Sequence, residues 1–192
     1  MFKAKFILGK SHQWINYNYN NFEIWLSSYE NTEIKNKIYK IIDTNENIKN
    51  NLENLIKNIS EHFSIIIIHQ NWALAAVDAF RSRPIFWTIL NKEILFSNNA
   101  LKLSNICKSE VDTNQRLAFQ MSGYTIGKGT LWKNIQNINS GELIFYNSYN
   151  SYNIVKYHLN YSAKITKNSF VSYKNELKNN IYSLIKNLIE KA

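Results

Sequence analysis

Few side chains in this sequence could act as a nucleophile or bind a metal ion. The one cysteine, Cys107, is the thiol candidate, but it falls in or at the end of an expected helix and is predicted to be a small buried apolar group. The four histidines are far apart and have no cysteine nearby, namely His12, His62, His69 and His158. We therefore expect no metal site and no cofactor bound to this chain.

Two further segments contain residues that other proteins use for chemistry. The glycines of residues 126–130 follow no strand and open no helix, so this segment is predicted to be a loop and not a phosphate site. Asp78 and Arg83 stand close together in the sequence, directly before Pro84. A lone acid and arginine form a structural pair more often than a catalytic one, so we interpret these three residues as shaping a loop.

Composition indicates a folded chain with a basic surface. Of the 192 residues, 45% are hydrophobic and 14% aromatic, which is enough to build a core. The formal net charge is +9, but the lysines are scattered among asparagines, which favours a solvated surface and predicts no nucleic-acid binding. The longest apolar run, residues 65–68, is far too short to cross a bilayer, so we expect no membrane association and a cytoplasmic location.

Hydrophobic patterning predicts the strands that would position these residues. The expected strands are residues 2–8, 38–42, 64–69, 72–77, 85–90, 93–96 and 142–146. Residues 91–92 have the right length for a tight hairpin turn, so the middle of the chain is predicted to be a β-meander. Residues 12–29 show no clear period, and residues 147–153 are predicted to be a surface loop.

Three helices are predicted from capping residues and the helical period. The first is expected over residues 44–59 with a cap at Asp43 or Thr44, the second begins at Asp112 or Thr113 and is ended by Gly123, and the third runs from about Ser169 to Lys191. The apolar side of the second helix would consist of Leu117, Phe119 and Met121. The third helix has a long apolar stripe, which must pack on this domain or dock on another chain.

Several segments, taken in order, resemble the motifs of one protein family. Residues 78–87 (DAFRSRPIFW) are similar to D-x-x-G-x-[RK]-P-[LI]-[YF]-[YFW], and residues 94–101 are similar to F-A-S-E-x-K-A-L. Residues 129–135 and 139–143, the latter with Gly141, resemble T-L-[FW]-x-x-I followed by P-x-G-x-x-L, and residues 156–158 stand in the place of a Tyr-Trp pair. This order and spacing resembles the N-terminal class II glutamine amidotransferase domain of the asparagine synthetase family.

The resemblance implies a fold and a partner. The implied fold is α+β, a four-layer αββα sandwich of the N-terminal-nucleophile (Ntn) hydrolase type, over residues 1–158. Residues 159–192 would be a linker and a helix that begins a truncated or separately encoded synthetase domain. That ATP-pyrophosphatase domain or subunit, with its S-G-G-x-D-S loop, would be the partner, and ATP and Mg would bind there. The sequence stops at Ala192 without this loop. The sequence leaves open whether the chain forms a homo-oligomer.

The departures from the family concern catalysis. The family's glutaminases attack glutamine with a cysteine exposed at the N-terminus, whereas position 2 here is Phe2. The R-L-S-I and N-G-E motifs that hold the substrate are missing, and Arg81 or Ser82 replaces the glycine of the first motif. We therefore expect no catalytic residue. We interpret the positions that match the family motifs as structural, namely Asp78, Arg83, Pro84 and Gly141.

Three hypotheses for function follow from these observations. The first is a non-catalytic amidotransferase-like domain that serves as scaffold or partner subunit in an ATP-dependent, amide-forming system, as in the β-lactam synthetase branch. The second is a working class II glutaminase whose nucleophile was missed, for example Ser11 exposed by cleavage after Lys10. The third is a degenerate fragment or a small interaction protein without a synthetase role.

Overall fold

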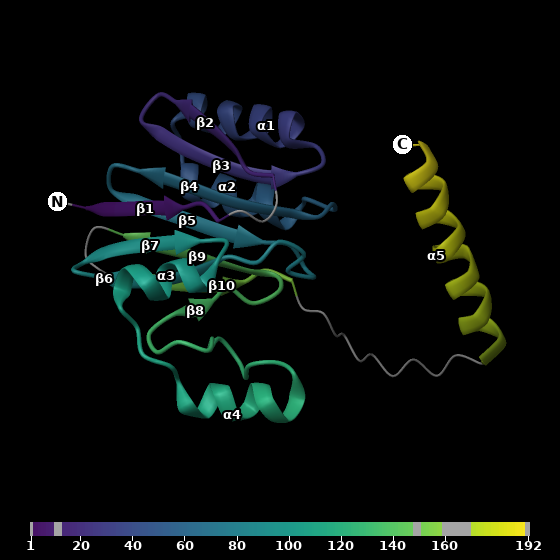
Figure 1. Ribbon diagram of the computed structural model, residues 1–192. Helices are drawn as coiled ribbons and strands as arrows, with labels where there is room; N and C mark the ends of the chain where they lie inside the picture. Colours follow the sequence, from purple (N-terminus) through teal and green to yellow (C-terminus); the bar gives the residue numbers. More distant parts are fainter. Residues whose placement is uncertain (1, 10–12, 148–150, 159–169, 191–192) are drawn as a thin grey trace. The chain divides into compact units, whose positions relative to one another are not determined.

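A computed structural model describes residues 2–9, 13–147, 151–158 and 170–190 of the chain (Figure 1). The chain divides into two compact units, Met1–Asn160 and Tyr161–Ala192. In the described residues the first unit contains two β-sheets and four helices, and the second contains one helix. This mixture confirms the predicted α+β class. The predicted domain boundary after residue 158 adjoins residues that lie outside the described ranges, and it stays a prediction.

The larger sheet is antiparallel throughout. In spatial order its strands are β10 (Tyr152–Lys156), β9 (Glu142–Asn147), β5 (Trp72–Val77), β4 (Phe63–His69), β3 (Phe22–Ser28) and β2 (Ile15–Tyr19). The central strands β4 and β5 are buried on both faces over most of their length. Such strands have continuous apolar runs in place of alternation, which is why the sequence predicted them.

The smaller sheet has the spatial order β1 (Lys3–Ile7), β7 (Glu93–Ser97), β6 (Phe86–Leu90) and β8 (Gln136–Asn137). Strands β6 and β7 form the predicted hairpin, and both turn residues, Asn91 and Lys92, have positive φ, as a two-residue type I′ turn requires. Strand β1 pairs with β7 in parallel, with Lys3 opposite Glu93 and Ile7 opposite Ser97. The start of β1 therefore lies at the turn end of the β6–β7 hairpin.

The helices of the first unit are α1 (Asn31–Thr44), α2 (Ile48–Lys57), α3 (Ala100–Cys107) and α4 (Thr113–Ser122). The predicted strand at residues 38–42 is wrong, because it lies inside α1, where Ile34, Ile38 and Ile42 bury one face at a spacing of four. The β-branched side chains made the short run resemble a strand. The helix expected at residues 44–59 begins later, because Asn45 and Asn47 both have positive φ and separate α1 from α2.

Three hydrophobic clusters hold the two sheets and helices α1, α2 and α3 together. One lies between the larger sheet and helices α1 and α2, the second between the two sheets, and the third between the smaller sheet and α3. Strand β4 shows how one strand serves two of them, since Ile65 and Ile67 belong to the first cluster and Ile66 to the second. Successive side chains of a strand point to opposite faces of the sheet, so each face of the larger sheet is covered.

Two other segments differ from the sequence-based expectation. Residues 12–29 include the hairpin β2–β3, which turns at Asn20 with a φ of 51°. Its strands carry asparagines among the tyrosines of β2, so the alternation was hidden. Part of the loop expected at residues 147–153 is strand, because β9 includes Asn147 and β10 begins at Tyr152.

Helix α4 has the predicted ends but not the predicted buried side. The side chain of Asp112 caps it by accepting hydrogen bonds from two backbone N–H groups, and Gly123 ends it with a φ of 79°. None of its residues is buried, and Leu117 and Met121 are 57% and 80% exposed. The expected apolar side of this helix is therefore a surface of the described chain.

Helix α5 (Phe170–Glu190) is the described part of the second unit. It falls within the predicted helix, whose expected end residues, Ser169 and Lys191, lie outside the described ranges. Leu177, Ile181 and Ile185 of its apolar stripe are exposed. None of the helices in the described ranges combines the length and the apolar character that a membrane crossing requires.

Candidate functional site

The loop that follows β5 is organised around the carboxylate of Asp78. This side chain is 3% exposed, and its Oδ1 atom accepts a hydrogen bond from the Phe80 N–H at 2.7 Å. Its Oδ2 atom accepts hydrogen bonds from the N–H groups of Phe63 at 3.3 Å and Ser82 at 3.2 Å. The Ser82 hydroxyl adds a bond to Oδ1 at 3.1 Å. A carboxylate whose acceptor positions are occupied in this way fixes a turn and the start of the neighbouring strand.

Gly141 joins a second motif segment to this loop. Its N–H donates to the Asp78 carbonyl at 3.0 Å, and its own carbonyl accepts bonds from the N–H groups of Tyr157 at 2.8 Å and His158 at 3.2 Å. Its φ is +65°, and a Cβ atom here would lie 2.7 Å from the Cβ of His158. Only glycine fits this position without a shift of the neighbouring backbone. The segments 78–87, 139–143 and 156–158 therefore meet at one junction.

The phenol of Tyr157 completes the junction. Its hydroxyl donates a hydrogen bond to the carbonyl of Val77, the last residue of β5. Burial, with a smaller contribution from the charge of Asp78, raises the pKa of Tyr157 well above its usual range. The phenol is therefore a fixed hydrogen-bond donor at neutral pH and holds the end of β5 against the segment that follows β10.

Arg83 and Pro84 occupy the end of the same loop. The guanidinium carbon of Arg83 lies 5.0 Å from the centroid of the Tyr29 ring, a cation–π arrangement. In the described part of the chain no ion pair joins Arg83 to Asp78, which differs from the structural pair inferred from their closeness in sequence. Pro84 stands just before β6, where its missing N–H removes no hydrogen bond from the sheet.

Arg81 takes the place of the motif glycine. Its φ is +55°, and its N–H donates to the Asp78 carbonyl at 3.0 Å. This left-handed conformation is the one that glycine adopts without strain, so the choice between Arg81 and Ser82 falls on Arg81. Its Nη1 atom donates to the Oδ1 atom of Asn137 at 2.8 Å. Burial lowers the pKa of the guanidinium.

Phe2 lies away from this junction. Its ring centroid is 5.7 Å from that of Tyr146, and the side chain packs against the cluster between the two sheets. Phe2 directly precedes β1, whose first residue, Lys3, pairs with Glu93 beside the β6–β7 turn. The Asp78 loop enters β6 from its other end, at Phe86. The structure thus brings Asp78, Arg83, Pro84 and Gly141 into one region and leaves Phe2 at the opposite end of the smaller sheet.

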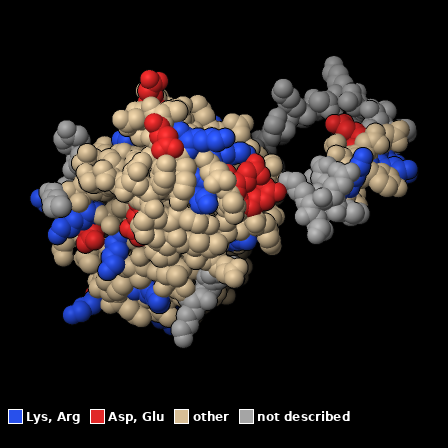
Figure 2. All heavy atoms as spheres, turned by 90° about the horizontal axis from the view of Figure 1, so that it is seen from above, with Lys and Arg blue, Asp and Glu red and all other residues tan. Residues whose placement is uncertain are grey.

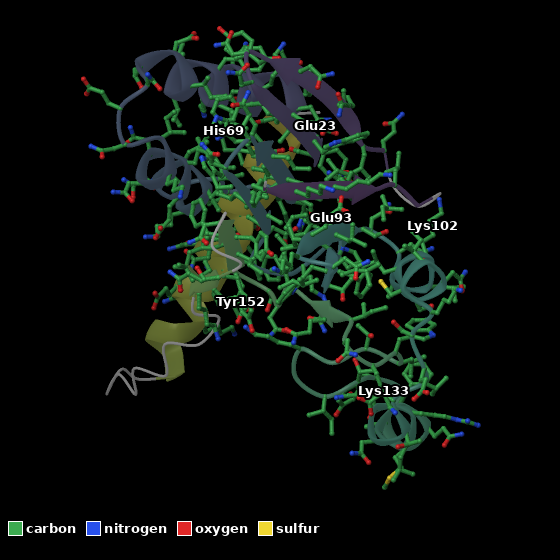
Figure 3. The ribbon with its side chains drawn as sticks, turned by 90° about the vertical axis from the view of Figure 1, so that its left-hand side faces the viewer. Glu23, His69, Glu93, Lys102, Lys133 and Tyr152 are labelled. Atoms are coloured by element: carbon green, nitrogen blue, oxygen red, sulfur yellow. The ribbon has the colours of Figure 1, made fainter. Side chains whose placement is uncertain are left out.

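A groove of about 850 Å³ lies at the Phe2 end of the molecule. Its described lining contains no serine, threonine or cysteine and consists of Phe2, Lys3, Ala4, Asn18, Asn20, Asn21, Phe22, Glu23, Ile68, His69, Gln70, Asn71 and Glu93. Figure 3 looks onto this end, with Glu23, His69 and Glu93 labelled. His69 stacks on Phe22 at 4.6 Å. Burial, and then the charge of Lys49, lowers the pKa of His69, which favours its neutral imidazole.

The two nucleophile candidates from the sequence have different outcomes. Cys107 is the last residue of α3 and is half-buried, and burial raises the pKa of its thiol. A raised pKa lowers the fraction of reactive thiolate, so this environment does not activate the cysteine. Ser11 lies outside the described residues.

Basic and acidic side chains are mixed on the face of the molecule that Figure 2 shows. Figure 2 shows Lys and Arg side chains dispersed over one face of the molecule, with Asp and Glu between them. Near the Asp78 loop, Lys128 forms an ion pair of 3.1 Å with Glu142, which is 8% exposed. The local charges are thus partly compensated within the chain. The predicted absence of nucleic-acid partners stays a prediction.

Sequence reasoning assigned no structural role to three residues that organise this region, namely Arg81, Asn137 and Tyr157. Asn137 is 3% exposed, and its Nδ2 atom donates to the carbonyls of Gly127 at 3.5 Å and Gly129 at 3.2 Å. Tyr157 was noted only as part of the Tyr-Trp-like segment. No sequence signal could have placed these side chains together, because their contacts join loops that are far apart along the chain.

The solved structures that are similar to this chain include two enzymes. The allosteric regulatory enzyme of purine biosynthesis superposes with a TM-score of 0.45 and 13% identity, over 77% of this chain and 31% of that one. Glutamine phosphoribosylpyrophosphate amidotransferase from B. subtilis, complexed with ADP and GMP, gives a TM-score of 0.43 and 12% identity over 77% of this chain and 32% of that one. The chain thus spans about a third of the length of these proteins. No protein-family model and no curated protein matches the chain.

Proposed function

We propose that the first unit is a glutamine amidotransferase-like domain of the Ntn-hydrolase type, related to that of the asparagine synthetases. In this proposal its elements form a four-layer αββα sandwich: α1 and α2, the larger sheet, the smaller sheet, and α3. The order of the three hydrophobic clusters supports this layering. The domain does not hydrolyse glutamine, and it serves as scaffold or partner subunit of a cytoplasmic, ATP-dependent, amide-forming enzyme.

One observation carries the family assignment. The segments that resemble asparagine synthetase motifs are separated by about sixty residues, yet Gly141 of one donates its N–H to the Asp78 carbonyl of the other at 3.0 Å. The motif positions also keep their backbone roles, because Arg81 has the positive φ expected of the motif glycine. Residues that were selected only by a pattern thus support each other in space.

The non-catalytic role rests on the groove beside Phe2. The family resemblance implies a glutaminase that attacks glutamine with a cysteine exposed at its N-terminus, together with groups that hold glutamine. Here an aromatic ring packs into the inter-sheet cluster at this position, and no described lining residue can act as that nucleophile. Cys107 belongs to α3 on the far side of the smaller sheet.

The experiment combines a glutaminase assay with intact mass spectrometry of the purified full-length chain. We expect no ammonia release from glutamine and no covalent adduct with the glutamine analogue 6-diazo-5-oxonorleucine. Cys107→Ala serves as the matched control, since it removes the one thiol. Ammonia release that survives Cys107→Ala but disappears in Ser11→Ala would contradict the proposal and favour a working glutaminase.

The partner role has its own test. The tagged chain should recover from its native cells a protein with an S-G-G-x-D-S loop, identified by mass spectrometry. Ile181→Lys places a charge on the exposed apolar stripe of α5 and should reduce that recovery, whereas Lys178→Ala, on the same helix, should not. Recovery of the chain alone would count against the partner role and favour a degenerate fragment.

A further inference from the structure

A second cavity, of about 340 Å³, lies beside Arg81. Four aromatic residues line it, Phe86, Phe119, Tyr124 and Trp132, together with Arg81, Asn137 and the loop backbone at three glycines. Small-molecule sites have this composition: mostly apolar walls, a few polar groups, and a volume of several hundred Å³. Several lining residues belong to the segments that resemble the family motifs, but the proposed function assigns no ligand to this cavity.

The guanidinium of Arg81 is half-buried without a counter-ion. Its Nη1 atom donates to Asn137, and in the described part of the chain the guanidinium forms no further hydrogen bond and no ion pair. The lowered pKa has burial as its cause, with no opposing attraction from an acid. A guanidinium has five N–H donors, and withdrawing this charge from water is unfavourable unless an anion compensates it. The cavity is where that anion would bind.

Asn137 holds Arg81 in a defined position. Its amide nitrogen donates to the carbonyls of Gly127 and Gly129, and its backbone N–H donates to the carbonyl of Lys128 at 2.9 Å. These bonds fix the amide so that its oxygen faces Arg81 at 2.8 Å. A ligand would therefore meet a preorganised guanidinium, and less free energy is lost in ordering it.

The backbone at Arg81 is strained. A φ of +55° is unfavourable for a residue with a Cβ atom and is less common outside glycine and asparagine, although Lys92 and Lys108 also have positive φ in this chain. Strained residues occur preferentially at binding and catalytic sites, where the surrounding structure maintains them. Here the turn places Arg81 in the wall of a cavity with aromatic residues, and Arg81 also borders a hollow lined by Glu142 and Lys156.

The charge balance selects the ligand class. One uncompensated guanidinium matches a singly charged carboxylate, which it can bind through two parallel hydrogen bonds. A phosphate with two charges would need a second cation, but Arg81 is the one cationic residue in the described lining of the cavity. The aromatic walls favour an apolar or aromatic body on the ligand.

We propose that the Arg81 cavity binds a monocarboxylate with an apolar, aromatic-sized body. Two sources share this chemistry: a free aromatic acid, and the carboxyl terminus of a peptide that ends in an aromatic residue. Asn137 positions the arginine, and Phe119 and Tyr124 contact the apolar body. The proposal stands or falls separately from the amidotransferase assignment, because no residue of the Phe2 groove takes part.

The test measures binding to the purified full-length chain by NMR line broadening or calorimetry. Phenylacetate is the first probe and phenylacetamide its uncharged match, and we expect the acid to bind at least about tenfold more tightly, as for a charge-assisted hydrogen bond. Phenyl phosphate should bind no better than phenylacetate. For the second source, the peptide acetyl-Gly-Phe with a free carboxyl terminus is compared with its C-terminal amide. Whichever acid binds more tightly, phenylacetate or the peptide, indicates which of the two sources the cavity prefers.

Arg81→Gly is the decisive variant, since glycine relieves the backbone strain while removing the guanidinium. We expect it to abolish the difference between acid and amide. Arg83→Gln is the matched control: it neutralises an arginine two positions away whose guanidinium lies over Tyr29 and does not line the cavity, and it should keep the difference. Equal binding of acid and amide, no binding of either acid at about 10 mM, or an unchanged preference in Arg81→Gly each overturns the proposal.

Discussion

Replacing Gly141 by alanine tests the junction between the motif segments most directly. The added Cβ atom would lie 2.7 Å from the Cβ and 2.8 Å from the carbonyl oxygen of His158, and the latter is backbone that cannot rotate away. The positive φ of +65° adds strain of about 1–2 kcal/mol for any residue with a Cβ atom. Moving His158 also weakens a hydrogen bond to the Gly141 carbonyl, at a cost of about 1 kcal/mol. We expect Gly141→Ala to lower the free energy of unfolding by about 2–3 kcal/mol.

Gly127→Ala is the matched control for this prediction. Its φ of +63° is nearly the same, but a Cβ atom there would meet nothing within 4 Å. It should therefore show the strain alone, about 1–2 kcal/mol. The measurement is urea unfolding of the full-length chain followed by tryptophan fluorescence, because all five tryptophans lie in the first unit. If the two variants are equally destabilised, His158 does not restrict Gly141 and the packing argument fails.

Three further outcomes are expected. Tyr157→Phe removes the hydroxyl that bonds the Val77 carbonyl and should cost about 1 kcal/mol in urea unfolding at pH 7. Burial raises the pKa of Tyr157 in the folded chain, so on raising the pH the unfolded chain releases this proton first. The stabilisation is therefore complete below about pH 10, the usual pKa of tyrosine, and is lost above it. Above that pH the wild type should lose stability more steeply than Tyr157→Phe. Asp112→Ala removes an N-cap and should speed amide hydrogen exchange in α4 in line with a loss of about 1 kcal/mol, whereas an unchanged exchange rate would exclude a capping role. Cys107 should react with iodoacetamide more slowly at pH 8 than after unfolding in urea, and equal rates would show that burial does not suppress its thiolate.

The central strands and α4 could be predicted because the signals for them are local. Continuous apolar runs indicate β4 and β5, and the two-residue linker between β6 and β7 has the length of a tight hairpin turn. Asp112 and Gly123 are a cap and a stop that act within one turn of α4. Helix α1 was missed because its three buried isoleucines were sampled over too short a window, in which β-branched residues favour a strand.

The sequence predicted several residues of the candidate site but not the contacts between them. The motif pattern selected Asp78 and Gly141, but their hydrogen bond depends on a pairing between separate loops. Arg83 was expected beside Asp78 because the two are close in sequence, yet the turn of the loop directs its side chain to Tyr29. The position of the Arg81 side chain depends on its φ angle and on its hydrogen bond to Asn137, which is distant in the sequence. Neither can be predicted from residue types alone.

The parallel pairing of β1 with β7 has a consequence for how this chain acquires its structure. The Ile7 carbonyl accepts a hydrogen bond from the hydroxyl of Ser97, a partner 90 residues further along. During synthesis β1 therefore remains without its neighbour strand until β6 and β7 have been made, and the entropy of closing such a long loop slows the step. Until then a strand edge with unpaired backbone groups is available to other nascent chains. A chaperone that shields this edge until β7 has been made should improve the yield of folded protein.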